Sequence, residues 1–329
     1  MKIKKLLCLV TAATFALPLA ACGNEETGET VHIYMPDGAP AIALASLMDA
    51  GYSRAEFTVV NAETIGQRVS TGAADMAIMP INAAATLYNK GVDIQILTVN
   101  THGNLYIIGD GDGDEFELGD LVGKKLGSIG QNAVPEYTLR ILLDNLKIDY
   151  EVSETAVSGK VAIRYAKDGS ALLPMINKGE VDYALIAEPA ATNAMNKFNK
   201  KLLCDMQEQW QELFESDYPQ ACLVAKKSFI ESDGDYVEDF IKTLEKNDGW
   251  AAAHPDETVE AIKAHMEEGT DPSLASLNAT IIKNCNIKTV RAEDCIEDCR
   301  AYFRLLTSLN TDIGTVLAEL PDDDIYYKG

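Results

Sequence analysis

The chain alternates short apolar segments typical of β-strands with longer helical segments, and this alternation limits its possible folds more than any other feature. Strands that alternate with helices of roughly 8 to 15 residues indicate a mainly parallel sheet with helices on both faces. The alternation begins at Val31, restarts near Gly119, and after Ala225 gives way to helical segments only, out to about Leu317. We therefore predict an α/β fold with a helical C-terminal part. The expected strands are 31–34, 57–60, 75–79, 94–99, 105–108, 126–129, 183–186 and 221–225.

A repeated motif indicates that the fold has two similar halves. Gly72–Pro80 and Gly179–Pro189 each combine a helix end, a glycine, an aspartate, a buried strand and a proline that enters the next helix. A body of about 300 residues also exceeds one comfortable hydrophobic core. We predict two facing lobes, each a mainly parallel sheet flanked by helices. The predicted divisions are 31–105 for the first part of lobe 1, 106–220 for lobe 2, and 221–329 for the return to lobe 1 with an α-helical C-terminal extension.

The N-terminal segment carries the marks of export. Three lysines precede an uncharged apolar run, Leu6–Ala21, as in a secretory signal, and the run is too short for a stop-transfer helix of about 20 apolar residues. It ends in Leu-Ala-Ala-Cys, which resembles the bacterial lipobox, and this implies that Cys22 is acylated. The alternative is an ordinary signal whose cleavage site contains cysteine. We predict a signal peptide over 1–21, a lipidated flexible stalk over 22–30, and an extracytoplasmic lipoprotein anchored to the membrane. Such a protein lies on the surface of a Gram-positive cell or at the periplasmic face of a Gram-negative membrane.

The chain is strongly acidic. Its formal net charge is -23, and removal of three lysines with the signal makes the mature chain -26. This charge argues against nucleic acid or an anionic membrane surface as a partner. A small anionic ligand would have to be held by local dipoles against an unfavourable overall field.

The cysteines and histidines do not form a recognisable metal motif. Five cysteines follow Cys22, and an odd number leaves at least one thiol free. Cys295 and Cys299 lie on one apolar stripe of a predicted helix, where buried thiols are at least as good an explanation as a bridge. The acidic segment 109–114 lacks the glycine and glutamate spacing of a calcium loop. We expect no metal and no cofactor. The other cysteines are Cys204, Cys222 and Cys285, and the histidines are His32, His102, His254 and His265.

Four predicted turns between a strand and the next helix are candidates for a ligand site. In open α/β sheets, ligands bind beyond the carboxyl ends of the strands, where helix N-termini expose unpaired N–H groups. No lysine or arginine lies in the four turns, so an anionic ligand would be bound by neutral donors, while Asp37 and Glu188 are candidates to accept from an amine or a ring N–H. Simple helix capping is the alternative for each turn. The candidate ligand-binding residues in these turns are Asp37, Gly38, Ala39, Asn82, Gly130, Gln131, Asn132 and Glu188.

Several segments of the chain resemble a known family. Together with the lipobox, they are similar to the sulfonate/taurine/nitrate and thiamine-precursor branch of ABC-transporter solute-binding proteins. The resemblance covers most of the stretch from Val31 to Met266. The segments that carry it are Gly72–Ala77, Asn82–Ala85, Leu121–Gly127, Glu188–Ala190 and Asp248–Glu257.

The resemblance implies the type II periplasmic-binding-protein fold, in which two lobes joined by two crossing strands close on a small molecule. It implies delivery of that molecule to a membrane permease and its ATPase, and hinges near Thr101–Leu105 and Tyr218–Cys222. Tyr106 falls on a crossing strand, where it would stack on a flat ligand or serve as a core tyrosine. The turns lack the basic residue of oxyanion-binding members. An alkylsulfonate, a pyrimidine vitamin precursor and another small polar metabolite therefore all stay open as ligands.

Two other functions compete with solute binding. The first is an enzyme on the same fold, such as a pyrimidine-precursor or menaquinone-pathway enzyme. Export and the lack of a paired acid and base with clear spacing argue against it. The second is a ligand-sensing lipoprotein without transport. We predict a monomeric binding protein and no enzymatic activity.

Overall fold

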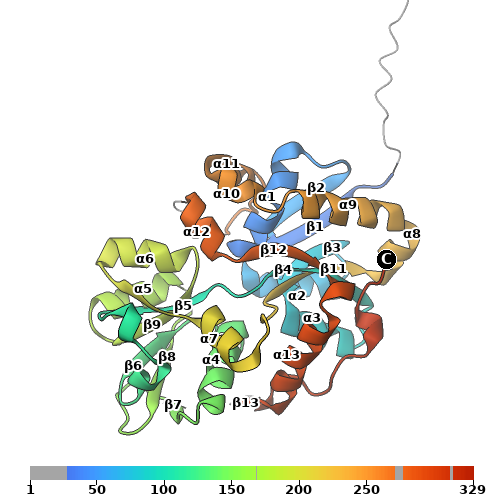
Figure 1. The fold of residues 1–329 in the computed structure, drawn as a ribbon. Helices are drawn as coiled ribbons and strands as arrows, with labels where there is room; N and C mark the ends of the chain where they lie inside the picture. The colour runs from blue at the N-terminus through green and yellow to red at the C-terminus, as the bar shows by residue number, and fades with distance from the viewer. Residues whose placement is uncertain (1–27, 168, 271–276, 312–313) are drawn as a thin grey trace, which may run out of the picture.

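The computed structural model describes residues 28–167, 169–270, 277–311 and 314–329, and its two lobes each contain a six-stranded sheet (Figure 1). Cys22 and the predicted signal peptide lie outside the described residues. The sheet of lobe 1 has the order β12-β4-β11-β3-β1-β2. Its strands are β1 (Val31–Pro36), β2 (Ala55–Val60), β3 (Met76–Pro80), β4 (Ile94–Thr101), β11 (Ala221–Lys226) and β12 (Ile287–Arg291).

The sheet of lobe 2 has the order β10-β5-β9-β6-β8-β7. A short hairpin of β13 (Asn310–Thr311) and β14 (Gly314–Thr315) stands apart from both sheets. The strands of lobe 2 are β5 (Leu105–Gly109), β6 (Lys125–Ser128), β7 (Tyr150–Val152), β8 (Val161–Tyr165), β9 (Tyr183–Ala187) and β10 (Lys201–Asp205).

Both sheets are mainly parallel, and the exceptions follow from the path of the chain. In lobe 1, β1, β2, β3 and β4 run in one direction, while β11 and β12 run in the other. In lobe 2 only β5 opposes the other strands. The chain leaves lobe 1 through the carboxyl end of β4 and enters lobe 2 as β5, so β5 starts at the lobe boundary and points away from it. β11 starts where the chain re-enters lobe 1 from lobe 2, so it runs antiparallel to its neighbours β3 and β4.

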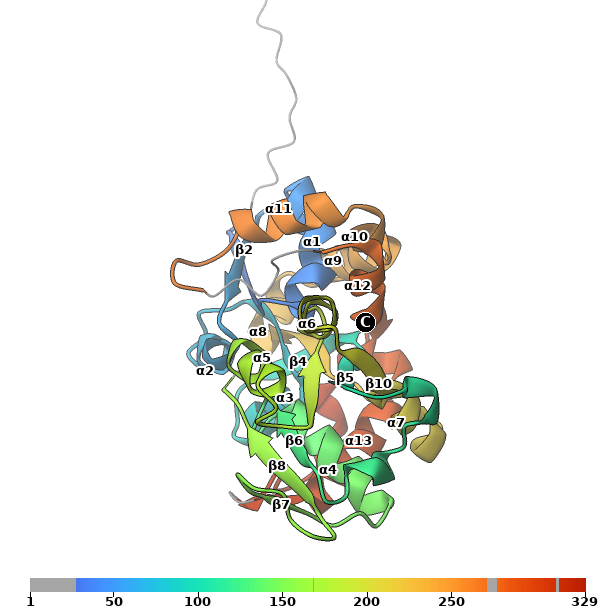
Figure 2. The same ribbon diagram turned by 90° about the vertical axis from the view of Figure 1, so that its left-hand side faces the viewer.

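Helices cover both faces of each sheet. In lobe 1 one core joins the sheet to α1, α9, α11 and α12, and another joins its other face to α2, α3 and α13. In lobe 2, α4 and α7 cover one face and α5 and α6 the other (Figure 2). The helices are α1 (Ala39–Ala50), α2 (Ile65–Ser70), α3 (Ile81–Asn89), α4 (Val134–Asn145), α5 (Gly169–Asn177), α6 (Ala190–Phe198), α7 (Met206–Phe214), α8 (Lys227–Ser232), α9 (Gly234–Lys246), α10 (Trp250–Ala253), α11 (Pro255–Ala264), α12 (Ala279–Asn284) and α13 (Ile296–Ser308).

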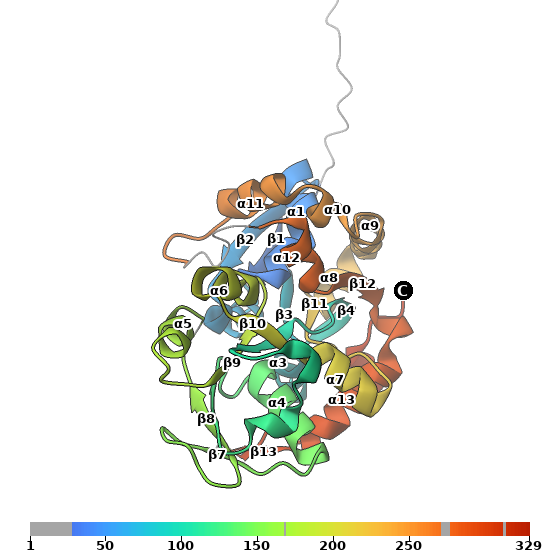
Figure 3. The ribbon, with the colours of Figure 1, turned by 60° about the vertical axis from the view of Figure 1, so that its left-hand side comes forward.

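The C-terminal helix α13 contacts both lobes. The apolar stripe predicted around Cys299 is its buried face, which packs into the lobe 1 core. The ring of Tyr302 on α13 also lies 5.7 Å from Trp210 of α7, a lobe 2 helix. Figure 3 shows α13 beside α7 and α4. The C-terminal extension therefore connects the lobes in addition to the two crossing segments.

The prediction of helices only after Ala225 is wrong at Ile287–Arg291, which forms β12, and at the two short strands β13 and β14. β12 pairs antiparallel with β4, at what would otherwise be an open edge of the lobe 1 sheet. Its sequence, Ile-Lys-Thr-Val-Arg, is rich in β-branched residues, and the distant edge of β4 supplies its hydrogen-bond partners. Among the described residues, no helix combines the length and apolar character needed to cross a bilayer.

Candidate ligand-binding site

The fold brings all four predicted turns to one interlobe face. In lobe 1, β3 and β1 lie on the β11 side of β4, and in lobe 2, β9 and β6 lie on the side of β5 away from β10. β3 and β1 run in the direction of β4, so their carboxyl ends point toward lobe 2. β9 and β6 run against β5, so their carboxyl ends point back toward lobe 1. Helix N-termini from both lobes therefore face each other across this boundary.

Gly38 shapes the turn between β1 and α1. Its backbone has φ 95° and ψ -145°, a conformation that only glycine adopts without strain. Asp37 donates its N–H to the Val60 carbonyl at 3.2 Å, which ties the end of β1 to the end of β2. Ala39 is buried as the first residue of α1, and Pro40 follows it. The glycine has no side chain to cap the helix, so its first turn is left without a side-chain acceptor.

Asn82 is the second residue of α3, directly after the turn that ends β3. Pro80 precedes the helix and offers no side-chain cap. The N–H of Ile81 donates to the Gln220 carbonyl at 3.1 Å, which links this turn to the return segment between the lobes. The Asn82 Oδ1 atom is buried and accepts no hydrogen bond from the described residues. A buried amide oxygen without a donor costs free energy, so this atom is suited to accept from a ligand or a bound water.

The turn between β6 and α4 is held in an unusual backbone conformation. Gly130 and Asn132 have φ values of 67° and 58°, and the N–H of Ala133 donates to the Gly130 carbonyl at 3.1 Å. The backbone N–H of Asn132 donates to Oε2 of Glu136 at 2.5 Å. The side chains of Gln131 and Asn132 are exposed. This turn therefore exposes two amide side chains on a backbone that is held in place by the hydrogen bond to Glu136.

Sequence reasoning missed the ion pair beneath this turn. Oε1 of Glu136 lies 2.5 Å from the guanidinium of Arg140, and their side chains are only 1% and 6% exposed. The guanidinium also lies 5.2 Å from the ring centre of Tyr150. The sequence signal for this ion pair was a Glu and an Arg four residues apart on a predicted helix. The same spacing also occurs on solvent-exposed helix faces, so it does not show that the pair is buried. Arg140 puts a buried positive charge behind a turn that itself contains none.

The carboxylate of Glu188 is engaged by protein groups. Its two oxygens accept from the N–H of Thr192 at 3.0 Å and from the Thr192 hydroxyl, so it caps the start of α6. The Asn284 amide of α12 reaches the same carboxylate at 3.3 Å from lobe 1. The backbone of Glu188 exchanges two further hydrogen bonds with Asn104, whose Oδ1 accepts from Gln220 at 2.9 Å. Glu188 thus lies in a network that joins both lobes at the crossing segments.

Tyr106 lies on β5 and is buried, with 5% of its surface exposed. Its hydroxyl donates to the carbonyl of Asn284 at 2.8 Å, so it also bridges lobe 2 to α12. Burial, with the nearby carboxylates of Asp205 and Glu188 contributing less, raises the pKa of this phenol well above its ordinary value. In Figures 1 and 3 α12 lies next to α6, where these contacts occur.

Two short segments join the lobes at the predicted hinges. His102–Asn104 connects β4 to β5, and 215–220 connects α7 to β11. Gly103 has φ 86°, and a Cβ there would overlap Oε1 of Gln207 and the ring of Tyr218. Its carbonyl accepts from the Asn286 amide at 2.6 Å. The first segment is therefore a tightly packed strand crossing.

The cysteines are structural in character. All five in the described residues are free and buried, and burial raises the pKa of the Cys204 thiol to about 12. Cys295 and Cys299 lie with their sulfur atoms 3.9 Å apart at the start of α13. In the part of the chain that the structure describes, no three His, Cys, Asp or Glu side chains are grouped so that they could hold a metal ion.

A family comparison identifies the chain. The family model described as NMT1/THI5 like matches residues 58–258, which is more than half of the sequence. The chain belongs to the NMT1/THI5-like family. The matched stretch contains the turns at Asn82, Gly130–Asn132 and Glu188, whereas the turn at Gly38 precedes it. A comparison with curated proteins found no match.

Solved structures show the fold of this family member. An ABC transporter protein from Parabacteroides distasonis has a TM-score of 0.73 at 19% identity, over 92% of this chain and 99% of the other. The periplasmic aliphatic sulphonate binding protein SsuA from Escherichia coli has a TM-score of 0.60 at 14% identity, over 84% and 93%. A ligand-binding component of an ABC-type import system from Staphylococcus aureus, with zinc bound, has a TM-score of 0.62 at 12% identity, over 92% and 97%. The predicted two-lobed periplasmic-binding-protein fold is confirmed.

Proposed function

We propose that this NMT1/THI5-like protein is the extracytoplasmic solute-binding component of an ABC importer and has no enzymatic activity. The observation that carries the proposal is the convergence of four strand-to-helix turns from two lobes on one interlobe face. The structurally similar proteins from Parabacteroides distasonis and Staphylococcus aureus carry names of ABC transport systems, which supports the same role here.

The binding mechanism follows from the two-lobed arrangement. Each lobe supplies half of the site, and a ligand that contacts both halves shifts the open–closed equilibrium by its higher affinity for the closed state. The hinge segments are Thr101–Leu105 and Tyr218–Cys222. Their tight packing makes closure a rotation of lobes about a fixed crossing. A permease and its ATPase would receive the ligand from the closed form.

The site residues indicate a small polar ligand held by neutral hydrogen-bond donors, since the turns contain no lysine or arginine. Helix N-termini and amide side chains would bind a negatively charged or carbonyl-rich group. The mature charge of -26 disfavours capture of an anion by long-range attraction, so affinity would come from short-range hydrogen bonds. Alkylsulfonates and pyrimidine vitamin precursors both fit this description. The proposed contacts are Asp37, Gly38, Ala39, Asn82, Tyr106, Gly130, Gln131, Asn132 and Glu188.

A thermal-shift screen of the fragment 23–329 tests the proposal. Alkylsulfonates, pyrimidine vitamin precursors and other small polar metabolites are added in turn, since a ligand at about 100 times its dissociation constant adds about 2.7 kcal/mol of stability. Asn82→Ala and Asn132→Ala should each weaken the response while the melting temperature without ligand stays nearly constant. Asn145→Ala is the matched control, because Asn145 lies at the far end of α4 and, among the described residues, its side-chain amide donates only to the Ile141 carbonyl of that helix. Wild-type responses from both site variants would mean that the turns are only helix caps.

We also propose that the body is tethered to the membrane as a monomeric lipoprotein. The signal peptide over 1–21, the acylated Cys22 and the stalk over 22–30 would place residues 31–329 outside the cell. In this proposal lobe 1 comprises 31–105 and 221–329, and lobe 2 comprises 106–220. Mass spectrometry of the N-terminal peptide from the membrane fraction tests the anchor. A peptide that begins at Cys22 with a lipid mass supports it, and an unmodified N-terminus contradicts it.

A further inference from the structure

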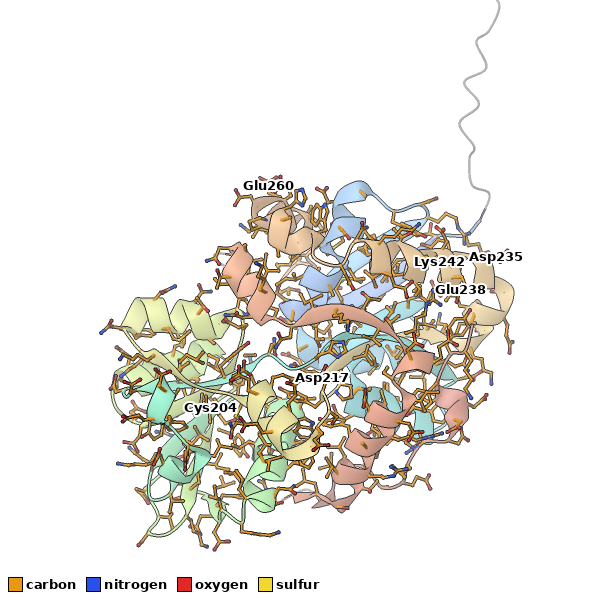
Figure 4. All side chains as sticks on the ribbon, in the orientation of Figure 1. Cys204, Asp217, Asp235, Glu238, Lys242 and Glu260 are labelled. Atoms are coloured by element: carbon orange, nitrogen blue, oxygen red, sulfur yellow. The ribbon has the colours of Figure 1, made fainter. Side chains whose placement is uncertain are left out.

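An interlobe cavity lies next to the crossing segments, on the side of β12 and β10. It has a volume of about 520 Å³ and is lined by α1, α10, α12 and β12 of lobe 1 and by α7 and the end of β10 of lobe 2. In the lobe 1 sheet, β12 lies on the side of β4 away from β1 and β3. In the lobe 2 sheet, β10 lies on the side of β5 away from β6 and β9. In Figure 4 Asp217, which lines the cavity, lies beside α7 and below β12. None of the nine proposed solute contacts lines this cavity, and α1 and α12 border both sites.

The two walls of this cavity carry different charges. On lobe 2 and its return segment, the lining includes Asp205, Glu208 and Asp217 and no lysine or arginine. On lobe 1 it includes Lys283 and Lys288. Neither lysine forms an ion pair within the described part of the chain. A negative wall on one lobe thus lies across the cavity from a positive wall on the other.

One lobe 1 carboxylate reduces the positive charge of that wall without reversing its sign. Asp248 also lines the cavity, but its carboxylate accepts from the N–H of Thr289 at 3.1 Å and from the Thr289 hydroxyl at 2.9 Å. It is therefore engaged within lobe 1. Burial raises the pKa of Asp248, and the charge of Lys288 opposes this shift, so the two side chains interact. With two lysines and one carboxylate, the lobe 1 wall keeps a net positive charge.

The negative wall is held rigid by hydrogen bonds. Asp217 Oδ1 accepts from the side-chain amides of Gln207 at 3.2 Å and Gln211 at 2.7 Å. Asp205 accepts from the N–H of Gln207 at 2.8 Å and so caps α7. The Oε1 atom of Gln207 is buried against Gly103 and accepts no hydrogen bond from the described residues. The wall thus holds two carboxylates in fixed positions, which suits an ammonium group.

We propose that this cavity is a second binding site for a small zwitterion. An ammonium group would bind the carboxylates of lobe 2, and a carboxylate group would bind Lys283 and Lys288 of lobe 1. The volume lies within the range of about 300–1,000 Å³ typical of small-molecule sites. The acidic field of the whole protein favours the ammonium end, and the two lysines supply the local attraction for the other. Because the walls belong to different lobes, an occupant would also be linked to movement at the hinge.

The first experiment compares probes by calorimetry and by amide chemical shifts of the fragment 23–329. γ-Aminobutyrate carries both charges, while butylamine and butyrate each carry one of them. We expect γ-aminobutyrate to bind at least 10-fold more tightly than either single-charge analogue and to shift amide signals within 205–217 and 282–288. Absence of binding, or equal binding of butylamine, would overturn the proposal.

Charge-neutralising variants locate the site. Glu208→Gln and Lys283→Gln should each weaken γ-aminobutyrate binding at least 10-fold. Both side chains are exposed, so the fold should be unaffected. Glu212→Gln on the same helix and Lys263→Gln on α11 are matched controls outside the cavity lining, and they should bind like wild type. Equal effects of the cavity variants and the controls would refute a specific site.

A final variant separates this site from the proposed solute site. Asn82 does not line the cavity, so Asn82→Ala should leave the affinity for γ-aminobutyrate within twofold of wild type. Loss of binding in this variant would show that the probe occupies the turns and would overturn the second site. Failure of the solute screen with intact γ-aminobutyrate binding would instead count against the solute proposal alone.

Discussion

The buried pair of Glu136 and Arg140 gives the sharpest stability prediction. Arg140→Met removes the guanidinium and retains an apolar side chain of similar length, which can still contact the ring of Tyr150. The carboxylate of Glu136, 1% exposed, then keeps its hydrogen bond from Asn132 and loses its counter-charge. A buried charge without compensation is the expected result.

The expected magnitude follows from the burial of the pair. Removing one partner of a buried ion pair costs about 3–5 kcal/mol, which is a large part of a typical unfolding free energy of about 5–15 kcal/mol. Glu136→Gln combined with Arg140→Met should recover about 2 kcal/mol of this loss, because a neutral glutamine can still accept from the Asn132 N–H. Most of the stability lost in Arg140→Met would thus come from leaving the buried Glu136 carboxylate without a counter-charge, and little from the attraction between the two groups.

Urea unfolding followed by circular dichroism measures these differences. The matched control is Lys160→Met, since Lys160 lies 2.8 Å from Glu151 in a pair whose side chains are 41% and 43% exposed. An exposed pair contributes about 1 kcal/mol or less. If Arg140→Met and Lys160→Met cost the same, or if the double variant is less stable than Arg140→Met, the argument from burial is wrong.

Two further predictions concern the first hinge. Gly103→Ala should lower the free energy of unfolding by more than backbone strain alone, which costs about 1–3 kcal/mol. Gly91→Ala is the control for urea unfolding and should lose less stability, because Gly91 has a similar φ of 84° but a Cβ there would meet nothing within 4 Å. Equal losses of stability would contradict the overlap with Gln207. Burial lowers the pKa of His102 below 6.5, so its stabilising contribution is present above about pH 6.5 and is lost as the pH falls. His102→Gln keeps a donor for the Lys288 carbonyl and should reduce the drop in urea midpoint between about pH 7.5 and pH 5.5; an unchanged drop would exclude His102 as its source.

Most strands in the sheet interiors were predictable, but the interior strand β8 was not predicted. β3 and β9 appear in the sequence as continuous apolar runs bounded by glycine and proline, and the structure places them in the interiors of their sheets. The edge strands β7, β10 and β12 are short and mixed in polarity, so no periodicity separates them from loops or helices. Their hydrogen-bond partners lie far away in the chain, as with Ile287 and Thr101.

The candidate site was predictable to the level of its turns. Gly38, Asn82 and Asn132 were identified because glycine, proline and asparagine mark local breaks between a strand and a helix. Glu136 and Arg140 were missed because burial of a charged helix position depends on what packs around the helix, and α4 is covered by the sheet, α7 and α13. Whether each turn contacts a ligand stays a prediction.

The sequence by itself determined the alternation of strands and helices, the positions of their breaks and the division into two lobes. These properties depend on residue periodicity and on backbone preferences over a few neighbouring positions. Only the tertiary structure decided that Thr192 and Asn284 donate hydrogen bonds to the Glu188 carboxylate. It also decided that side chains of opposite charge from the two lobes line the cavity beside β12 and β10. Those outcomes depend on the distance between groups that are remote in the chain, and that distance is set by how the two sheets pack and cross.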